Sequence, residues 1–275
     1  MKSELTLLAV AALSLSIHAA IKPPKPEPTI EQRKAANAER EARYLKEEGG
    51  EVIRPGTMKG FLLIGNAQKT VDQFEIEETR DYFWFRLNYN IKVAPSEPAT
   101  PANASALLAE SGAAAAVFLT EDATLPILLV SPEDHWAIVN VTRLKKDAKT
   151  PKYVTMRTKK ELVRAIVHCF GGNCSSYEGS ILSAIKEPSD LDRYAGYELP
   201  EDVFDRFRPY LSGLGLTPAE RMSFLCAAYE PWCPPPTNEY QKAIWEKIQN
   251  KKADAADPTN RWKRDFPDKE KPKAK

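Results

Sequence analysis

The stretch RTKKELVRAIVHCFGGNC, from Arg157 to Cys174, decides the fold because it predicts one long helix with a defined end. At about 100° per residue, its apolar residues form a band on one side that faces a core. This band consists of Leu162, Val163, Ile166, Val167 and Phe170. The opposite side carries Arg157, Glu161, Arg164 and His168, at the spacings of three and four residues that bring helical side chains together. Gly171 and Gly172 then end the helix, since glycine accepts the left-handed conformation of a C-terminal cap.

The end of this helix resembles the zinc-binding motif of the metzincin peptidases, His-Glu-x-x-His-x-x-Gly-x-x-His. When His168 and Gly171 are aligned with the second histidine and the glycine, Arg164 takes the place of the first histidine. Ala165 then takes the place of the glutamate that acts as general base, and Cys174 that of the third histidine. The resemblance implies that the frame of the motif is kept while its side chains have changed.

The preceding segment extends the resemblance. AIVNVTRL (Ala137–Leu144) and the helix after it are similar to the strand, linker and active helix of archaemetzincins, and LTEDATLPILLV stands in the same order before them. The likeness covers about residues 58–192. It implies an α/β (α+β) fold, a metzincin-like mixed twisted sheet with an active-site-type helix and a mostly helical C-terminal lobe. The alternation of predicted strands and helices favours an α/β or α+β class independently.

The side chains at the motif positions predict that ordinary zinc hydrolysis is lost. The guanidinium of Arg164 stays protonated and has no lone pair for a metal, and Ala165 offers no base for a zinc-bound water. After removal of a leader, the chain holds only two histidines, His135 and His168, so a set of three histidines cannot be assembled. We therefore predict no catalytic residues and no cofactor: a secreted, metzincin-like pseudoenzyme without zinc hydrolase activity, whose cleft binds a peptide or protein.

Arg164 and His168, one turn apart and close to Glu161, are the candidate binding residues, with a carboxylate such as a peptide C-terminus as ligand. The alternative for this group is an ion network on the helix surface that includes Arg157. Two other functions stay open. One is a zinc metallopeptidase with an altered ligand set, His168, Cys174 and a third residue from elsewhere. The other is a structural or assembly factor of the cell envelope.

The ends of the chain predict export and flexible extensions. Residues 1–20 have the positive start, short apolar run and small-residue end of a signal peptide, which predicts a secreted or periplasmic protein. A proline-rich spacer and a charged helix (21–54) precede the metzincin-like domain (55–250), whose upper lobe reaches about residue 172 and whose helical C-terminal lobe is 173–250. Residues 251–275 form a charged tail. No later apolar stretch is long enough for a transmembrane segment.

Composition narrows the partners. Lysine and arginine number 39 against 38 acidic residues, which excludes a charge-driven nucleic-acid-binding protein and leaves a peptide or protein of the envelope as partner. The four cysteines are Cys169, Cys174, Cys226 and Cys233. In an exported chain they predict disulfides, with three pairings open, while a four-cysteine zinc site and free thiols are the alternatives.

Residue periodicity predicts most of the remaining elements. Period-two alternation predicts a strand from Phe85 to Val93, and apolar runs predict strands over 114–120, 126–130 and 136–143. Residues 95–109 read as a loop. Helical spacing predicts helices over 201–211 and 218–229, and Thr29 with Gln32 forms a capping box at the start of the charged helix.

Overall fold

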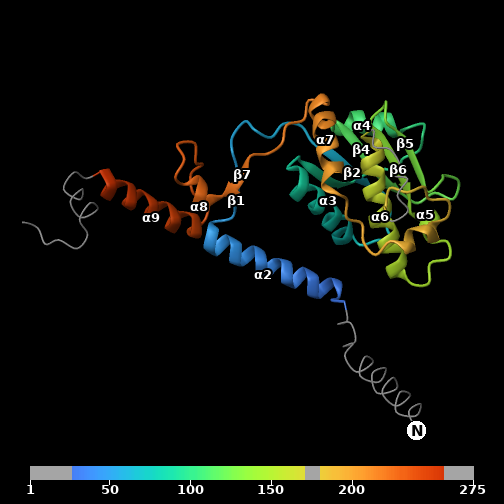
Figure 1. Ribbon diagram of the computed structural model, residues 1–275, viewed down its shortest axis with the longest axis horizontal. Helices are drawn as coiled ribbons and strands as arrows, with labels where there is room; N and C mark the ends of the chain where they lie inside the picture. The colour runs from blue at the N-terminus through green and yellow to red at the C-terminus, as the bar shows by residue number, and fades with distance from the viewer. Residues whose placement is uncertain (1–26, 171–179, 257–275) are drawn as a thin grey trace, which may run out of the picture.

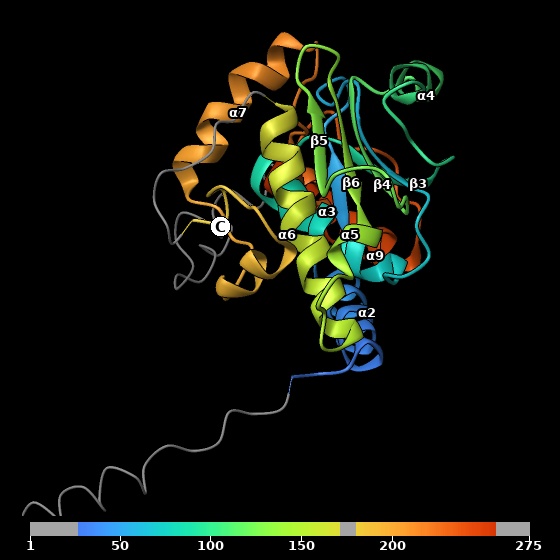
Figure 2. The ribbon, with the colours of Figure 1, turned by 90° about the vertical axis from the view of Figure 1, so that its right-hand side faces the viewer.

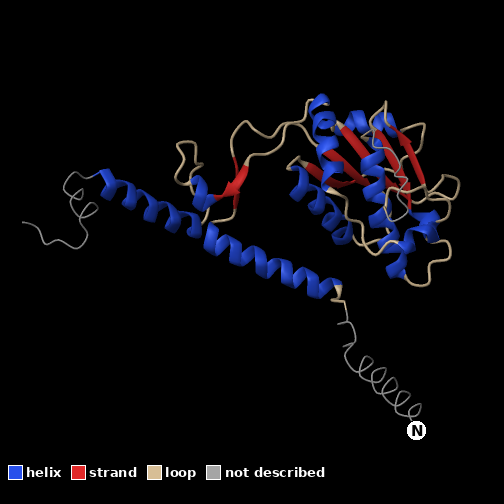
Figure 3. Ribbon diagram, in the orientation of Figure 1, coloured by secondary structure: helices blue, strands red, loops and turns tan. Residues whose placement is uncertain are grey.

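The computed structural model describes residues 27–170 and 180–256, and its centre is a five-stranded mixed sheet (Figure 3). The strands lie in the order β3-β2-β4-β6-β5, with β5 antiparallel to β6 and the other neighbouring pairs parallel. Their bounds are β2 Leu62–Asn66, β3 Ile91–Pro95, β4 Ala115–Thr120, β5 Leu128–Ser131 and β6 Trp136–Asn140. In the part of the chain that is described, β5 is an edge strand, and no strand pairs with its outer side.

The central strands are buried on both faces, as expected for parallel strands between two layers of helices. Side chains alternate along β4, so Val117 and Leu119 join one apolar cluster while Ala116 and Phe118 join the other. The apolar runs of the sequence predicted strands at β4, β5 and β6, and all three strands are present, although the third ends at Asn140 and a short helix, Val141–Leu144, replaces the rest of its expected range.

Helices cover both faces of the sheet. The larger cluster lies under α3 (Gln73–Leu87) and α6 (Pro151–Cys169), and the smaller one lies under α4 (Ala104–Ser111). The short helix α5 (Val141–Leu144) connects β6 to α6, which runs along the sheet beside β6 and β5 (Figure 2). This arrangement brings α6 next to the edge strand β5.

After residue 180 the chain returns along α6 and then covers α3. A 3₁₀ helix, η1 (Pro188–Arg193), is followed by α7 (Glu201–Gly213). Phe204 and Phe207 of α7 are buried and pack edge-on against Phe83 of α3 and Phe170, the residue that caps α6. Aromatic pairs of this kind each contribute about 0.5–1.5 kcal/mol beyond the area they bury. They join α7 to the helices under the sheet.

Both ends of the described chain meet in a third apolar cluster, separate from the two that cover the sheet. It contains α2 (Ile30–Glu48), β1 (Glu51–Ile53), β7 (Arg221–Ser223), α8 (Phe224–Ala227) and α9 (Glu239–Ala256), and β1 pairs antiparallel with β7. Its apolar centre is Phe224, Ala228 and Ile248. Figure 1 shows α2 and α9 extending on the side away from the edge strand. The capping box at Thr29 and Gln32 is present, as the sequence predicts.

A buried ion network attaches α2 to the main body. Lys159 of α6 lies 2.9 Å from the carboxylates of Glu75 and Glu78 of α3, and Arg33 of α2 pairs with the same two carboxylates. Burial acts to raise the pKa of the Glu75 carboxyl, but hydrogen bonds from Arg33 and Lys159 outweigh it and hold the pKa below its usual value. The ion network therefore attaches the first turn of α2 to α3 and α6, while α2 as a whole has no buried residue.

Three of the expected elements are wrong. Helix α3 continues to Leu87 and ends at Asn88, whose φ of 61° is left-handed, so the strand starts only at Ile91. Helix α4 lies inside the expected loop 95–109. Residues 218–229 contain the short strand β7 and one turn of helix instead of a long helix, because β7 pairs with β1 near the start of the chain. The mixed sheet and the helix over 201–211 are as predicted.

The expected signal peptide and most of the expected tail lie outside the described residues, although α9 continues to Ala256. Within 27–170 and 180–256, no helix combines the length and hydrophobicity needed to cross a bilayer. The proposed domain boundaries stay a prediction.

Candidate functional site

From Arg157 to Cys169, helix α6 is buried on every side except at His168, and this differs from the amphipathic helix that its sequence indicates. The apolar band Leu162, Val163, Ile166, Val167 and Phe170 faces the core as predicted. On the opposite side, Arg157, Glu161 and Arg164 are only 1%, 1% and 5% exposed. The return segment, residues 180–194, covers them. A surface ion network is therefore excluded for these three side chains.

Three basic residues of α6 bind the return segment, mostly through backbone carbonyls. Arg157 forms a bidentate pair with Asp192, at 2.9 and 2.6 Å. Lys160 donates to the carbonyl of Leu191 at 2.9 Å and to that of Tyr194. Burial lowers the pKa of the Lys160 ammonium. Because these donors are charged and buried, each bond contributes more than an ordinary hydrogen bond, about 1.5–3 kcal/mol.

Arg164 continues this row at the position where the metzincin motif has its first histidine. Its Nη1 donates to the carbonyls of Ile181 at 2.5 Å and Ser183 at 2.6 Å. Its Nε lies 3.1 Å from Oε2 of Glu161. The N–H does not point at that oxygen, so both atoms lack a hydrogen bond among the described residues and interact as an ion pair alone. Burial raises the pKa of the Glu161 carboxyl, and the charge of Arg164 opposes this shift.

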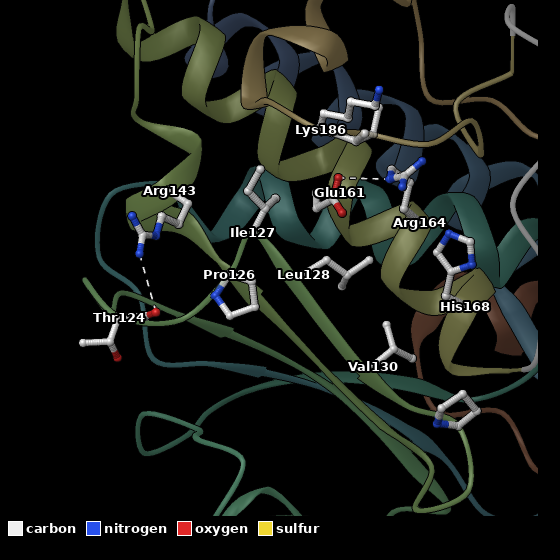
Figure 4. A pocket seen from close by; sticks show the side chains of 12 residues that line it. Thr124, Pro126, Ile127, Leu128, Val130, Arg143, Glu161, Arg164, His168 and Lys186 are labelled. Carbon is white, nitrogen blue, oxygen red and sulfur yellow. Dashed lines mark hydrogen bonds and ion pairs between the residues drawn. The ribbon is translucent and has the colours of Figure 1, made fainter.

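Glu161, Arg164 and His168 line one cavity of about 780 Å³, which we call the α6–β5 groove (Figure 4). The three side chains lie in a row along α6 and face Leu128 and Val130 of β5. The other lining residues are Thr124, Pro126, Ile127, Pro132, Arg143, Ile185 and Lys186. The structure thus brings together all three candidate binding residues of the sequence analysis.

The wall formed by β5 has an open backbone edge. Asn140 N–H donates to the carbonyl of Ile127 at 2.9 Å, which marks Ile127 and Asn140 as a hydrogen-bonded pair. Antiparallel pairing alternates, so Leu129 and Ser131 also bond to β6, whereas Leu128 and Val130 direct their N–H and C=O groups away from it. The latter two residues are the ones that line the groove. An extended peptide alongside β5 would find their donors and acceptors ready.

The sequence analysis missed two cations of this groove. Arg143 follows β6 and donates its Nε to the carbonyl of Leu125 at 2.9 Å. Lys186 lies on the return segment, across α6 from β5 (Figure 4). Arg143 belongs to the segment AIVNVTRL that carries the archaemetzincin resemblance, but nothing in its local pattern indicates a groove. Only folding brings the two basic side chains to the same cavity.

The described residues of this site do not fit a catalytic zinc. The guanidinium of Arg164 occupies the centre of the row and carries a permanent positive charge, and Ala165 is fully buried. Residues 27–170 and 180–256 contain no group of three His, Cys, Asp or Glu side chains able to hold a metal. His168 is half-buried at the groove and has a further polar interaction. Cys174, the second residue of the alternative ligand set, lies outside the described residues.

The three cysteines that the structure describes form no disulfide with one another. Cys169, Cys226 and Cys233 are unpaired thiols in the structure. Cys169 is buried at the end of α6, near the carbonyl of Ala116 of β4, while Cys233 packs against the smaller cluster of α8 and α9. Cys169 and Cys233 lie in different apolar clusters, so these two described cysteines do not pair with each other. Pairing of Cys174 is not described.

The other histidine lies at one end of the same region. His135 occupies the turn between β5 and β6 with a left-handed φ of 61°. Its Nδ1 lies 3.1 Å from the hydroxyl of Tyr210 of α7, and the two rings pack edge-on. Burial raises the pKa of the Tyr210 hydroxyl. His135 therefore joins the β5–β6 turn to α7.

Comparison with solved structures places this chain near one group of proteins. The archaemetzincin of Methanopyrus kandleri is 17% identical, with a TM-score of 0.45 over 58% of this chain and 99% of that protein. The fold is similar to that of archaemetzincins. The archaemetzincin of Archaeoglobus fulgidus is 15% identical (TM-score 0.39; 53% of this chain, 99% of that one). A zinc-dependent peptidase of Methanocorpusculum labreanum is also 15% identical (TM-score 0.40; 54% and 100%). No protein-family model and no curated protein sequence matches.

Proposed function

We propose that this protein is an exported, metzincin-like pseudoenzyme that binds an extended peptide in the α6–β5 groove without hydrolysing it. The observation that carries the proposal is the state of Arg164. A side chain that cannot bind a metal occupies the centre of the groove, with its Nη1 bonded to the return segment and its Nε paired with Glu161. With Ala165 beside it, the site offers neither a first metal ligand nor a general base.

The edge of β5 supports binding as the remaining function of the groove. Leu128 and Val130 leave two N–H and two C=O groups without a strand partner among the described residues. Strand addition to such an edge supplies affinity through main-chain hydrogen bonds, and pockets for alternate side chains supply selectivity. The cavity beside this edge, of about 780 Å³, has room for side chains of an added strand. Its wall mixes apolar residues with the charged row of α6.

A metal and peptidase assay separates this proposal from a metallopeptidase with an altered ligand set. The protein without residues 1–20 is incubated with zinc, dialysed, and analysed for bound metal and for cleavage of a quenched fluorescent decapeptide library. We expect less than stoichiometric zinc and no cleavage that 1,10-phenanthroline inhibits. Bound zinc and inhibitor-sensitive cleavage, both lost in His168→Ala, would establish the enzyme and refute the proposal.

Amide exchange then tests strand addition itself. Hydrogen exchange measured by NMR, with and without the same decapeptide library, should show protection of the Leu128 and Val130 amides. The amides of Leu129 and Ser131, which already bond to β6, serve as internal controls and should not change. Val130→Pro removes one outward donor from an edge strand without breaking a bond to β6 and should weaken peptide binding. Unchanged exchange at both outward amides would refute peptide binding by this edge.

A further inference from the structure

The charges around the α6–β5 groove are unbalanced. Its described lining residues include three permanent cations, Arg143, Arg164 and Lys186, but only one carboxylate, that of Glu161. Glu161 is 1% exposed, and burial raises the pKa of its carboxyl. Even with Glu161 ionised and paired with Arg164, two cations stay without a carboxylate among these residues. The described lining of the groove therefore carries net positive charge.

Among the described residues, no acidic side chain forms an ion pair with Arg143 or Lys186, the two exposed cations of the groove. Asp190 accepts the backbone N–H groups of Lys186 and Glu187, both at 3.0 Å, and its carboxylate pairs with Arg193 at 2.8 Å. The ammonium of Lys186 itself has no carboxylate within 4.0 Å among the described residues. Its charge is thus available to a ligand in the groove.

Arg143, on another wall of the groove, likewise has no ion-pair partner among the described residues. Its guanidinium donates to the carbonyls of Leu125 at 2.9 Å and Thr124 at 3.5 Å, which orient the side chain without changing its charge. Asp122 accepts from the amides of the same turn, at 2.6 Å from Thr124 and 3.3 Å from Leu125, and forms no ion pair with Arg143 within the described part of the chain. Arg143 and Lys186 therefore lie on different walls of the groove, and neither has a carboxylate partner among the described residues.

Arg164 adds a buried donor to the same groove. Its Nη1 and Nε are engaged with the return segment and with Glu161, while its Nη2 has no hydrogen-bond partner among the described residues. Arg164 is only 5% exposed, so the free N–H groups of its Nη2 are in a largely buried place. They should bind a carboxylate more tightly than a neutral acceptor, because charge-assisted hydrogen bonds are stronger than neutral ones. This side chain faces the groove in Figure 4.

We propose that the groove selects an extended peptide that carries a carboxylate, from an acidic side chain or from its own C-terminus. This inference rests on the proposed function, because strand addition to β5 is what places the peptide. In an added strand, every second side chain points to the same face. When one peptide residue directs its carboxylate to the cations, the peptide residues two positions before and after it lie beside Leu128, Val130 and Ile185. Apolar or β-branched residues are therefore favoured at those two peptide positions.

The test uses fluorescein-labelled octapeptides of alternating threonine and valine with one variable central position. Aspartate, asparagine or lysine stands at this position, and each peptide has either a free or an amidated C-terminus. Fluorescence anisotropy at low salt should give about tenfold tighter binding for at least one carboxylate source than for the uncharged asparagine amide. A preference for the aspartate amide assigns an internal acid, and one for the asparagine peptide with a free C-terminus assigns the terminal carboxylate. The lysine amide should bind weakest.

Variants connect the preference to the groove. Lys186→Gln and Arg143→Gln should each weaken the preferred peptide about fivefold, the effect of one partly exposed ion pair, and leave the asparagine amide unchanged. Lys251→Gln, the same change on the exposed face of α9, is the matched control. The uncharged asparagine peptide with an amidated C-terminus could protect the Leu128 and Val130 amides as strongly as the peptides with a carboxylate do. This result would refute the selectivity for a carboxylate but not peptide binding in the α6–β5 groove. If no peptide protects them, the proposed function fails as well.

Discussion

Replacing Arg164 with methionine tests how α6 is held. The variant removes two bonds from Nη1, to the carbonyls of Ile181 at 2.5 Å and Ser183 at 2.6 Å, and the cation 3.1 Å from Glu161. Hydrogen bonds from a charged donor contribute about 1.5–3 kcal/mol each, and losing one member of a buried ion pair costs about 3–5 kcal/mol. These losses overlap because they concern one side chain. We expect the free energy of unfolding to fall by about 3–5 kcal/mol at neutral pH.

The loss should depend on pH through Glu161. The folded-state pKa of its carboxyl is already above the usual 4.5, and removal of Arg164 raises it further. An acid whose folded pKa exceeds its unfolded pKa contributes stability below the unfolded value and loses it as pH rises through the folded value. The deficit of Arg164→Met relative to wild type should therefore be smaller at pH 5 than at pH 8. Urea unfolding followed by tryptophan fluorescence measures both.

Two further variants make this prediction refutable. Glu161→Gln in the Arg164→Met background removes the unpaired carboxylate and should recover part of the lost stability at pH 8. Arg206→Met, which breaks an exposed pair with Asp202 at 3.0 Å, should change stability by less than about 1 kcal/mol. The assignment of Arg164 as a structural cation is wrong if its replacement costs no more than that of Arg206, or if the deficit is equal at both pH values.

Three other outcomes follow from the same structure. Lys159→Met should destabilise the protein by about 3 kcal/mol and speed amide exchange in α2, whereas Lys34→Met, an exposed lysine of α2, should do neither; equal exchange in the two variants would contradict the network. Gln241→Leu removes a buried bond to the Gly49 carbonyl (2.7 Å) and should cost about 1–3 kcal/mol, measured by urea unfolding. Burial raises the pKa of the Cys169 thiol to about 12, so iodoacetamide at pH 8 should label exposed Cys226 and spare Cys169 in peptide mass spectra.

The sheet and its main helix follow from local sequence because each element has a consistent pattern over its whole length. The apolar runs at β4, β5 and β6 and the apolar band of α6 all appear where the sequence predicts them. The strand expected from Phe85 fails because two periods overlap there. Phe83 and Leu87, four residues apart, both face the core, so helical packing against α7 wins over the alternation that starts at Phe85.

Tertiary structure decided what the sequence pattern could not show about the polar side of α6. Arg157, Glu161 and Arg164 look like an exposed face when the helix is considered alone. They are buried because the return segment lies over them. Its carbonyl groups, which every residue type carries, accept bonds from Lys160 and Arg164, while the carboxylate of Asp192 pairs with Arg157. Backbone acceptors leave no trace in the pattern of side chains.

By itself, the sequence determined α6, three strands of the sheet, and the presence of Arg164 and Ala165 side by side in that helix. The groove could not be predicted from the sequence, because it forms only when β5, α6, Arg143 and Lys186, which belong to separate segments, come together in the folded chain. Spacing of three or four residues reports which side chains share one turn of a helix. It carries no information on which distant segment will cover them, and that cover determines whether a charge is solvated, paired or left to bind a ligand.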